Sequence, residues 1–293
     1  MSTRIERIEP READLGEGMR VRRALPTRQR RMIGAWCFLD HAGPVEFAPG
    51  GGMHVGAHPH ITLQTFTWLI DGEVLHRDSL GNEQVIRPGQ VNLMTAGHGI
   101  VHTEDSLPEA RRLHAAQLWI ALPPDQADCP PAFEHHPVLP QWEQDGCTLT
   151  LLAGHHGQRQ SPARLHSPLI GLDICCRSAA ELDLPIDPSF EYGILPLEGS
   201  LHIGEETFDS TAFACFDPGT DSIRLQLAAD TRLLVIGGVP FAQPVLMAWN
   251  FVGHSREAIV AAQNDWETGN PRFGPVEGST RRLVAPPLPW IGS

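Results

Sequence analysis

The chain has 293 residues, 41% of them hydrophobic, which is enough for one large domain or two ordinary domains with substantial cores. Its 35 acidic residues outnumber 22 lysines and arginines, and the formal charge of −13 argues against an electrostatic nucleic-acid surface. No apolar run approaches the roughly 20 residues that span a membrane, and residues 1–11 lack the apolar core of a signal peptide, so we expect a cytoplasmic protein.

Neither the cysteines nor the arginines of the chain indicate a site. The six cysteines are scattered and form no Cys-x-x-Cys motif, which predicts buried or half-buried free thiols rather than a disulfide framework or a zinc site. Arginines gather between Arg20 and Arg31, but the rest of the chain is acidic. We therefore expect this cluster to be a solvated or salt-bridged face.

The first half of the chain predicts short strands that wrap into a β-barrel. Alternating residues at 65–70, the turn Asp71-Gly72 and a second segment at 73–76 are typical of a hairpin. A loop at 77–82, a further strand and the turn Arg87-Pro88-Gly89 follow, and Pro-Gly suits the centre of a type II turn. These segments are too short for helices.

Two pairs of potential metal ligands flank these strands. His58-Pro59-His60 precedes them and His102-Thr103-Glu104 follows them, and alternate residues of a strand share one face. If the barrel brings the two pairs together, three imidazoles and one carboxylate would hold a metal with open positions. We expect one divalent ion, with iron(II) preferred over nickel, manganese, copper or zinc. For His54, His76 and His98 we expect structural or solvent roles.

The second half of the chain predicts another barrel. Residues 115–122 form an apolar strand, and six prolines between residues 123 and 140 then indicate a linker. Strand-like segments resume near Cys147, and Leu197-Glu198-Gly199-Ser200 occupies the place that Ile70-Asp71-Gly72-Glu73 has in the first half. The chain therefore predicts an all-β protein with two tandem jelly-roll β-barrels, a metal-binding domain at 1–135 and a second domain at 136–293.

The second barrel differs where the first carries its ligand pairs. Residues 187–192 contain no His-x-His pair, and only Glu191 and His202 lie nearby, so we expect a structural or regulatory barrel without metal ligands. One short C-terminal helix is predicted after it. Ser255 suits its N-cap, an apolar stripe includes Ile259 and Trp266, and Gly269 suits its end.

The block from His58 to Asp105, together with Phe38-Leu39-Asp40-His41-Ala42-Gly43-Pro44, resembles the signature of the pirin family, a branch of the cupins. The resemblance covers nearly the whole chain and implies a bicupin fold. It also implies that His58, His60, His102 and Glu104 are the metal ligands. The chain departs from the usual pirin pattern at Ile61, Gln64 and His98, which bears on substrate preference.

The resemblance implies two alternative functions. The first is a metal-dependent dioxygenase of the quercetinase type, which would take a flavonol or another hydroxylated aromatic and dioxygen, with Glu104 as ligand and proton acceptor. The second is a non-catalytic metal-containing pirin that binds and regulates a protein partner. We expect a monomer without direct nucleic-acid or membrane contacts in either case, and the fold cannot decide between the two.

Overall fold

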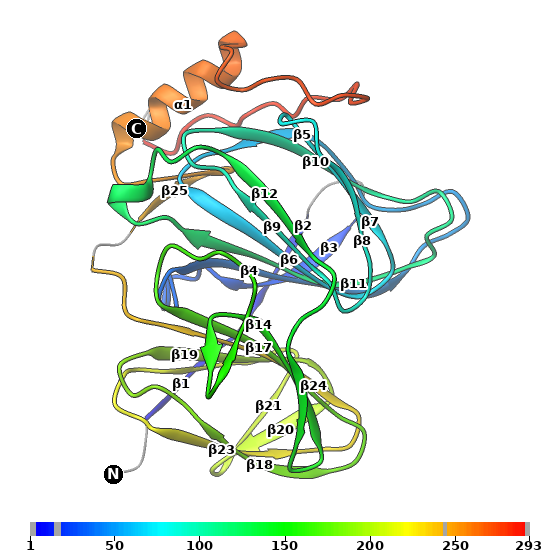
Figure 1. Ribbon diagram of the computed structural model, residues 1–293, viewed down its shortest axis with the longest axis vertical. Coiled ribbons are helices and arrows are strands. Elements are labelled where there is room, and N and C mark those ends of the chain that lie inside the picture. Colours follow the sequence, from blue (N-terminus) through cyan, green and yellow to red (C-terminus); the bar gives the residue numbers. More distant parts are fainter. Residues whose placement is uncertain (1–3, 15–18, 243–244, 291–293) are drawn as a thin grey trace. The chain divides into compact units, whose positions relative to one another are not determined.

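The computed structural model describes residues 4–14, 19–242 and 245–290. They form β-strands, one short 3-10 helix η1 (Pro124–Gln126) and one α-helix, α1 (Arg256–Thr268), as Figure 1 shows. The chain divides into two compact units. Unit 1 comprises residues 1–12, 22–41 and 138–242, and unit 2 comprises residues 13–21, 42–137 and 243–293. The expected division into 1–135 and 136–293 stays a prediction.

The strands of unit 2 form two facing sheets of a jelly roll, and β2, β3 and β4 run from the residues of one unit into those of the other. The larger sheet has the order β12 (Ala132–His136), β9 (Val91–Thr95), β6 (Leu63–Asp71), β11 (Arg112–Ala121), β4 (Trp36–Glu46), β3 (Arg20–Leu25) and β2 (Arg11–Asp14). The smaller sheet has the order β5 (His54–His60), β10 (Ile100–Ser106), β7 (Val74–Asp78) and β8 (Glu83–Ile86). A small ribbon pairs β25 (Leu246–Ala248) with β26 (Phe251–Gly253).

Unit 1 repeats this arrangement with a seven-stranded and a four-stranded sheet. The larger sheet has the order β1 (Ile5–Ile8), β22 (Phe213–Phe216), β19 (Glu191–Glu198), β24 (Thr231–Gly238), β17 (Leu169–Cys176), β14 (Cys147–Ala153) and β13 (Gln141–Gln144). The smaller sheet has the order β18 (Ala180–Pro185), β23 (Ser222–Leu227), β20 (Ser200–Ile203) and β21 (Glu206–Asp209). A ribbon of β15 (His155–His156) and β16 (Arg159–Gln160) completes the unit. The predicted all-β fold with two tandem barrels is confirmed.

The two glycines that suggested an internal repeat occupy matching turns. Gly72 lies between β6 and β7 with φ +91°, and Gly199 lies between β19 and β20 with φ +67°. A Cβ atom on Gly72 would lie 2.2 Å from the carbonyl oxygen of Arg112, and one on Gly199 would lie 2.5 Å from Oγ1 of Thr231. Each barrel therefore needs glycine at this turn for two reasons, a left-handed backbone and a close neighbouring strand.

The cores of the two units differ in polarity. The sheets of unit 1 enclose an apolar cluster that includes Leu172, Ile194, Phe208 and Leu225, all buried. In unit 2, buried positions of the facing strands include histidines, threonines, an aspartate and an asparagine. Burying polar groups costs free energy unless they are paired, so these side chains of unit 2 need partners or a ligand.

The proline-rich stretch after β11 is not simply a linker. It contains η1, and residues Ala132–His136 form β12, which pairs antiparallel with β9 at the edge of the larger sheet. The prolines at 130, 131 and 137 lie just outside this strand, where they remove no ladder hydrogen bond. The sequence prediction was therefore wrong about this segment, because edge strands tolerate closely flanking prolines.

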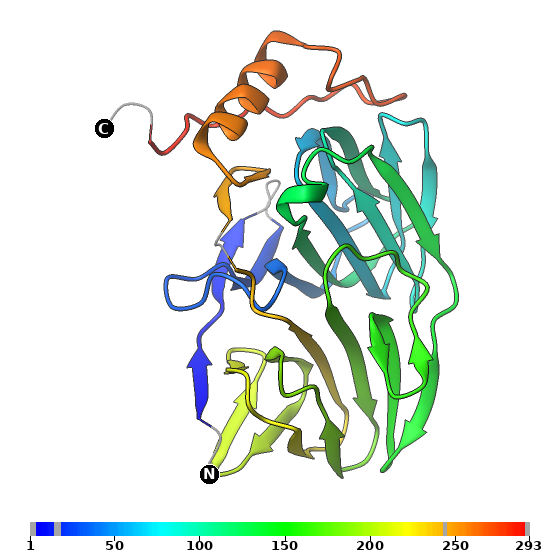
Figure 2. The same cartoon turned by 60° about the vertical axis from the view of Figure 1, so that its left-hand side comes forward.

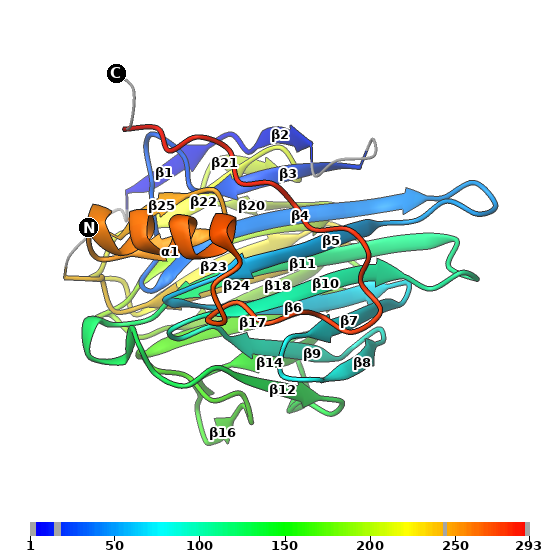
Figure 3. The same cartoon turned by 90° about the horizontal axis from the view of Figure 1, so that it is seen from above.

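Helix α1 begins and ends at the predicted residues. The Ser255 side chain accepts a hydrogen bond from the Ala258 amide at 3.2 Å, and Gly269 ends the helix with φ 70°. Its buried residues Ile259 and Trp266 share an apolar cluster with Ala57 and Val101 of β5 and β10. Helix α1 and the segment after it thus lie on the outer face of the smaller sheet of unit 2, as Figures 2 and 3 show.

The arginine cluster and the cysteines have the roles expected of them. Arg23 donates two hydrogen bonds of 2.7 Å to the Asp40 carboxylate, and Arg30 forms ion pairs that include Glu6 and Glu191 within unit 1. All six cysteines are free. Among the described residues, no helix has the length and apolarity that crossing a membrane requires.

Candidate metal centre

Three buried histidines meet on the inner face of the smaller sheet of unit 2. His58 and His60 lie on β5 and His102 lies on β10, directly opposite His58 in the antiparallel ladder. The ring centroids of His58 and His102 are 4.3 Å apart, and one ring nitrogen from each of the three histidines lies within 4.8 Å of the other two. Strand alternation and cross-strand pairing thus bring these predicted ligands together.

Backbone carbonyls fix the protonation of two of these rings. His58 donates from Nδ1 to the carbonyl of Gly56 at 2.8 Å, and His60 donates from Nδ1 to the carbonyl of Asn250 at 2.9 Å. A carbonyl oxygen can only accept, so Nδ1 carries the proton in both rings when they are neutral. The lone pair of each ring is therefore on Nε2, the atom that a metal would bind.

Burial keeps the three imidazoles uncharged. Desolvation lowers the pKa of His58 to about 4, although the Gly56 carbonyl opposes part of this shift. Desolvation and the neighbouring imidazoles hold the pKa values of His60 and His102 well below their ordinary value. Neutral imidazole is the form that binds metal ions, so these side chains can coordinate without first releasing protons.

The spacing of the nitrogens fits a bound ion. Nε2 of His60 lies 3.2 Å from Nε2 of His102. Two imidazole nitrogens that bind one ion at about 2.0–2.1 Å, at right angles to each other, lie about 3 Å apart. A cation here would bind the lone pair of both nitrogens when His60 and His102 each carry their proton on Nδ1. The chemistry and spacing of this group therefore suit a transition metal.

Glu104 is placed differently from the three histidines. It follows His102 by two residues on β10, but the register with β5 shifts between them, so Glu104 lies opposite Val55. Its carboxylate is partly buried, interacts with the Thr67 hydroxyl and His76, and lies outside the group of three histidines. Desolvation raises the pKa of Glu104, with His76 and Thr67 opposing the shift. Its role as fourth ligand stays a prediction.

Side chains from the larger sheet face the histidines across the barrel. The ring of Trp119 on β11 meets His60 edge-on at 5.0 Å, and the ring of Phe133 on β12 stacks on His76 at 4.3 Å with an interplanar angle of 12°. Aromatic walls of this kind exclude water and favour planar, apolar ligands. Strand β12, which was mistaken for linker, therefore contributes to the site.

A third alternating pair lies beside the three histidines and was missed from the sequence. His76 and Asp78 are buried on β7, with Nε2 of His76 3.1 Å from Oδ2 of Asp78. Nδ1 of His76 lies 3.4 Å from Nδ1 of His102. The pattern His76-Arg77-Asp78 has the same spacing as the two predicted ligand pairs. This spacing could have predicted that His76 and Asp78 lie next to the histidine group.

The remaining candidate residues lie away from the histidine group. His54 is exposed and paired with Asp105, and His98 is exposed, which agrees with the structural or solvent roles expected for them. Gln64 donates to Thr95 and lies on the opposite face of β6 from Thr67. Ile61 packs in the apolar cluster beneath α1. Residues 61 and 64, which depart from the usual pirin pattern, therefore contact neighbouring strands and α1 rather than the histidine group.

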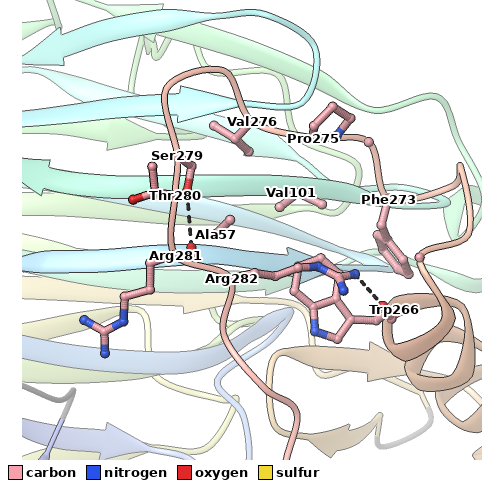
Figure 4. A pocket seen from close by; sticks show the side chains of 12 residues that line it. Ala57, Val101, Trp266, Phe273, Pro275, Val276, Ser279, Thr280, Arg281 and Arg282 are labelled. Atoms are coloured by element: carbon pink, nitrogen blue, oxygen red, sulfur yellow. Dashed lines mark hydrogen bonds between the residues drawn. The ribbon is translucent and has the colours of Figure 1, made fainter.

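A cavity of about 320 Å³ lies on the other side of β5 and β10 from the histidines. Ala57 and Val101 form its floor, and Trp266, Phe273 and the segment 274–282 enclose it, as Figure 4 shows. Ala57 and Val101 alternate with His58 and His102 along their strands, so they point outward. This cavity is separate from the histidine group.

In unit 1, the two residues considered as possible ligands have other partners. Glu191 accepts hydrogen bonds from the Gly34 amide and from Arg30, and His202 is exposed and bonded to Thr207. They do not meet as a pair. Among the described residues, the histidine group of unit 2 is the only cluster of its kind.

The stability of the metal-free protein should depend on pH through His58. The folded-state pKa of His58 is about 4, whereas a histidine in an unfolded chain has a pKa of about 6.5. The folded state is therefore most stable above pH 6.5 with respect to this group. As the pH falls from 6.5 to 4, the free energy of unfolding decreases by about 3 kcal/mol. Chemical unfolding between pH 7 and pH 4 should show a smaller loss in His58→Gln than in wild type. Equal losses in the two proteins would contradict this assignment.

Comparison with known proteins agrees with the geometry of the site. The pirin model matches residues 18–120, and the model of the pirin C-terminal cupin domain matches residues 171–274. The chain belongs to the pirin family. Among pirins, it is 60% identical to a Pseudomonas aeruginosa protein named "Putative quercetin 2,3-dioxygenase PA1205", over 98% of this chain and 91% of that one. It is 36% identical to a pirin-like protein of Caulobacter vibrioides, over 89% of this chain and 92% of that one.

Solved structures place this pirin among bicupins of the same kind. A crystal structure of quercetin 2,3-dioxygenase from Acinetobacter baumannii superposes with a TM-score of 0.95 at 46% identity. That match covers 97% of this chain and 96% of the other. The correspondence therefore extends over both barrels, including the strands that carry the three histidines.

Proposed function

We propose that this pirin is a metal-dependent dioxygenase of the quercetin 2,3-dioxygenase type. The observation that carries the proposal is the convergence of three buried, neutral imidazoles at the centre of one barrel. The similarity to relatives named for quercetin 2,3-dioxygenase supports the choice of reaction. We propose iron(II) as the metal, because imidazoles with one hard carboxylate and open positions suit it.

His58, His60 and His102 would hold the metal through Nε2, and Glu104 would complete the ligand set. The metal supplies a net positive centre at which an anionic oxygen substrate and dioxygen can meet. Trp119 and Phe133, which contact His60 and His76, would give the substrate site an apolar, aromatic lining. Glu104, with its raised pKa, accepts the proton of the substrate hydroxyl.

The proposed reaction consumes one flavonol and one dioxygen, opens the heterocyclic ring and releases carbon monoxide. Purification without chelator, followed by reloading with iron(II), nickel(II), manganese(II) or copper(II), would identify the active metal. Oxygen uptake and carbon monoxide release should then be measured with quercetin and related flavonols. A flavone that lacks the 3-hydroxyl is the matched control, because it has no acidic proton at the reacting position.

We expect oxygen uptake with flavonols and none with the flavone. Metal-loaded protein that takes up no oxygen with any hydroxylated aromatic would contradict the dioxygenase proposal. The alternative of a metal-containing protein that binds and regulates a partner would then be favoured.

A further inference from the structure

The histidines of the site do not have equivalent environments. The Nδ1 protons of His58 and His60 point at neutral backbone carbonyls. His102 instead has Nδ1 3.4 Å from Nδ1 of His76, whose other nitrogen lies 3.1 Å from the Asp78 carboxylate. His102 is therefore the histidine of this group that connects to a buried negative charge.

Asp78 is held firmly in place by the turn after β7. Its Oδ1 accepts hydrogen bonds from the amides of Leu80 and Asn82, at 2.9 and 3.1 Å. The Asn82 side chain donates to both carboxylate oxygens. These bonds leave Oδ2 directed at His76, and both side chains are almost completely buried. The interaction is therefore little screened by solvent.

The ring plane of His76 is fixed as well. Phe133 stacks on it at 4.3 Å with an interplanar angle of 12°, which favours the ring orientation in which the two nitrogens face His102 and Asp78. The ionised carboxylate can only accept a hydrogen bond, so Nε2 of His76 carries a proton. Neutral His76 then has its lone pair on Nδ1, which faces His102.

We propose that Asp78 and His76 form a positioning relay that holds the proton of His102 on Nδ1 and strengthens its Nε2 as a metal donor. The inference rests on the proposed role of His102 as a ligand. A neutral His102 that binds metal through Nε2 carries its proton on Nδ1, and His76 is the residue placed to accept it. Partial transfer of negative charge through two hydrogen bonds makes His102 a stronger donor than His58 or His60.

The test compares Asp78→Asn with a matched control in the same hairpin. Glu83→Gln removes a carboxylate that pairs with Arg77 at 2.7 Å on the outer side of β7 and β8. Affinity for nickel(II) and zinc(II) is measured by competition with a chromophoric chelator. We expect Asp78→Asn to bind about 10- to 100-fold more weakly than wild type, as is typical when a partner of a metal ligand is removed. Glu83→Gln should bind as wild type does.

Nitrogen NMR of the zinc-loaded protein provides the readout that separates the relay from general loosening. In wild type, His102 should carry its proton on Nδ1, and Asp78→Asn should shift the His102 nitrogens while those of His58 and His60 stay in place. Equal shifts in all three histidines, or an unchanged affinity, would overturn the proposal. A His102 protonated on Nε2 would also overturn it.

A second variant guards against a folding failure of the first. His76→Phe keeps a ring against Phe133 but removes the acceptor for His102. It should weaken metal binding at least as much as Asp78→Asn, with the same selective NMR change, and wild-type affinity in this variant would overturn the relay. Neither readout uses a substrate. If wild type binds metal but does not cleave flavonols, the proposed reaction is refuted and the relay is not. If wild type does not bind metal, both proposals are refuted.

Discussion

Replacing His58 and His102 together with Ala should weaken metal binding by on the order of 10⁴-fold or more. Protein zinc sites with four ligands bind with about 10–16 kcal/mol, so loss of two ligands costs roughly half of that free energy. Elemental analysis should find about one metal per chain in wild type and essentially none in the double variant. Flavonol-dependent oxygen uptake should disappear with the metal.

The matched control for this experiment is His54→Ala with His98→Ala. It also removes two imidazoles from unit 2, but both are exposed and lie outside the histidine group. The control should retain its metal. Two metals per chain in wild type, or an unchanged metal content in the His58 and His102 variant, would show that the site is elsewhere. Circular dichroism of the metal-free proteins checks that all of them are folded.

The histidine group could be predicted because short-range sequence patterns indicate most of its geometry. His58 and His60 share a strand face by alternation alone, and the turns at Gly72 and Gly89 predicted which strands fold back. The direct pairing of His58 with His102 depends on the register of β5 and β10. That register could not be predicted from either segment. The expectation that the two pairs meet came from the prediction that the short strands between them close into a barrel.

The position of Glu104 could not be predicted from short-range sequence patterns alone. Alternation places it on the same face as His102, and this much agrees with its interaction with Thr67 across the barrel. Its carboxylate nevertheless lies outside the group of three histidines, and the ladder between β10 and β5 is irregular between His102 and Glu104. The extra residue on β5 lies between Val55 and His58, where Gly56 packs closely against the backbone of Arg281. No sequence pattern indicated it.

Contacts between distant segments were also beyond the sequence. Strand β1 pairs with β22, so Ile5 lies opposite Phe216. Neither segment contains a sequence feature that predicts its partner strand. Such pairings depend on the whole chain, because many short strands of similar composition could fill an edge position. The relay of His76 and Asp78 lay within reach of pattern analysis, because its spacing matches that of the ligand pairs. A structural role was expected for His76, but Asp78 was not predicted as its partner.

Replacing Glu104 with Gln should separate proton transfer from metal binding. The substitution keeps the shape of the side chain but removes its charge and its basicity. We expect metal affinity to fall by about 10- to 100-fold, as for perturbed metal sites in general. We expect kcat for flavonol cleavage at saturating metal to fall by roughly 10²-fold or more, as for a lost general base. Single-turnover oxygen uptake with metal-saturated protein would measure the second effect alone.

Asp105→Asn is the matched control, because it removes the adjacent carboxylate, which is partly exposed, pairs with His54 and contributes less than burial does to the raised pKa of Glu104. It should leave both metal affinity and turnover close to wild type. The environment of Glu104 argues for a direct role in proton transfer, since burial raises the pKa of its carboxyl. A Glu104→Gln protein that binds metal and cleaves flavonols at the wild-type rate would assign the proton acceptor to another group. A variant that loses metal binding but regains full turnover when metal is in excess would make Glu104 a ligand without a role as base.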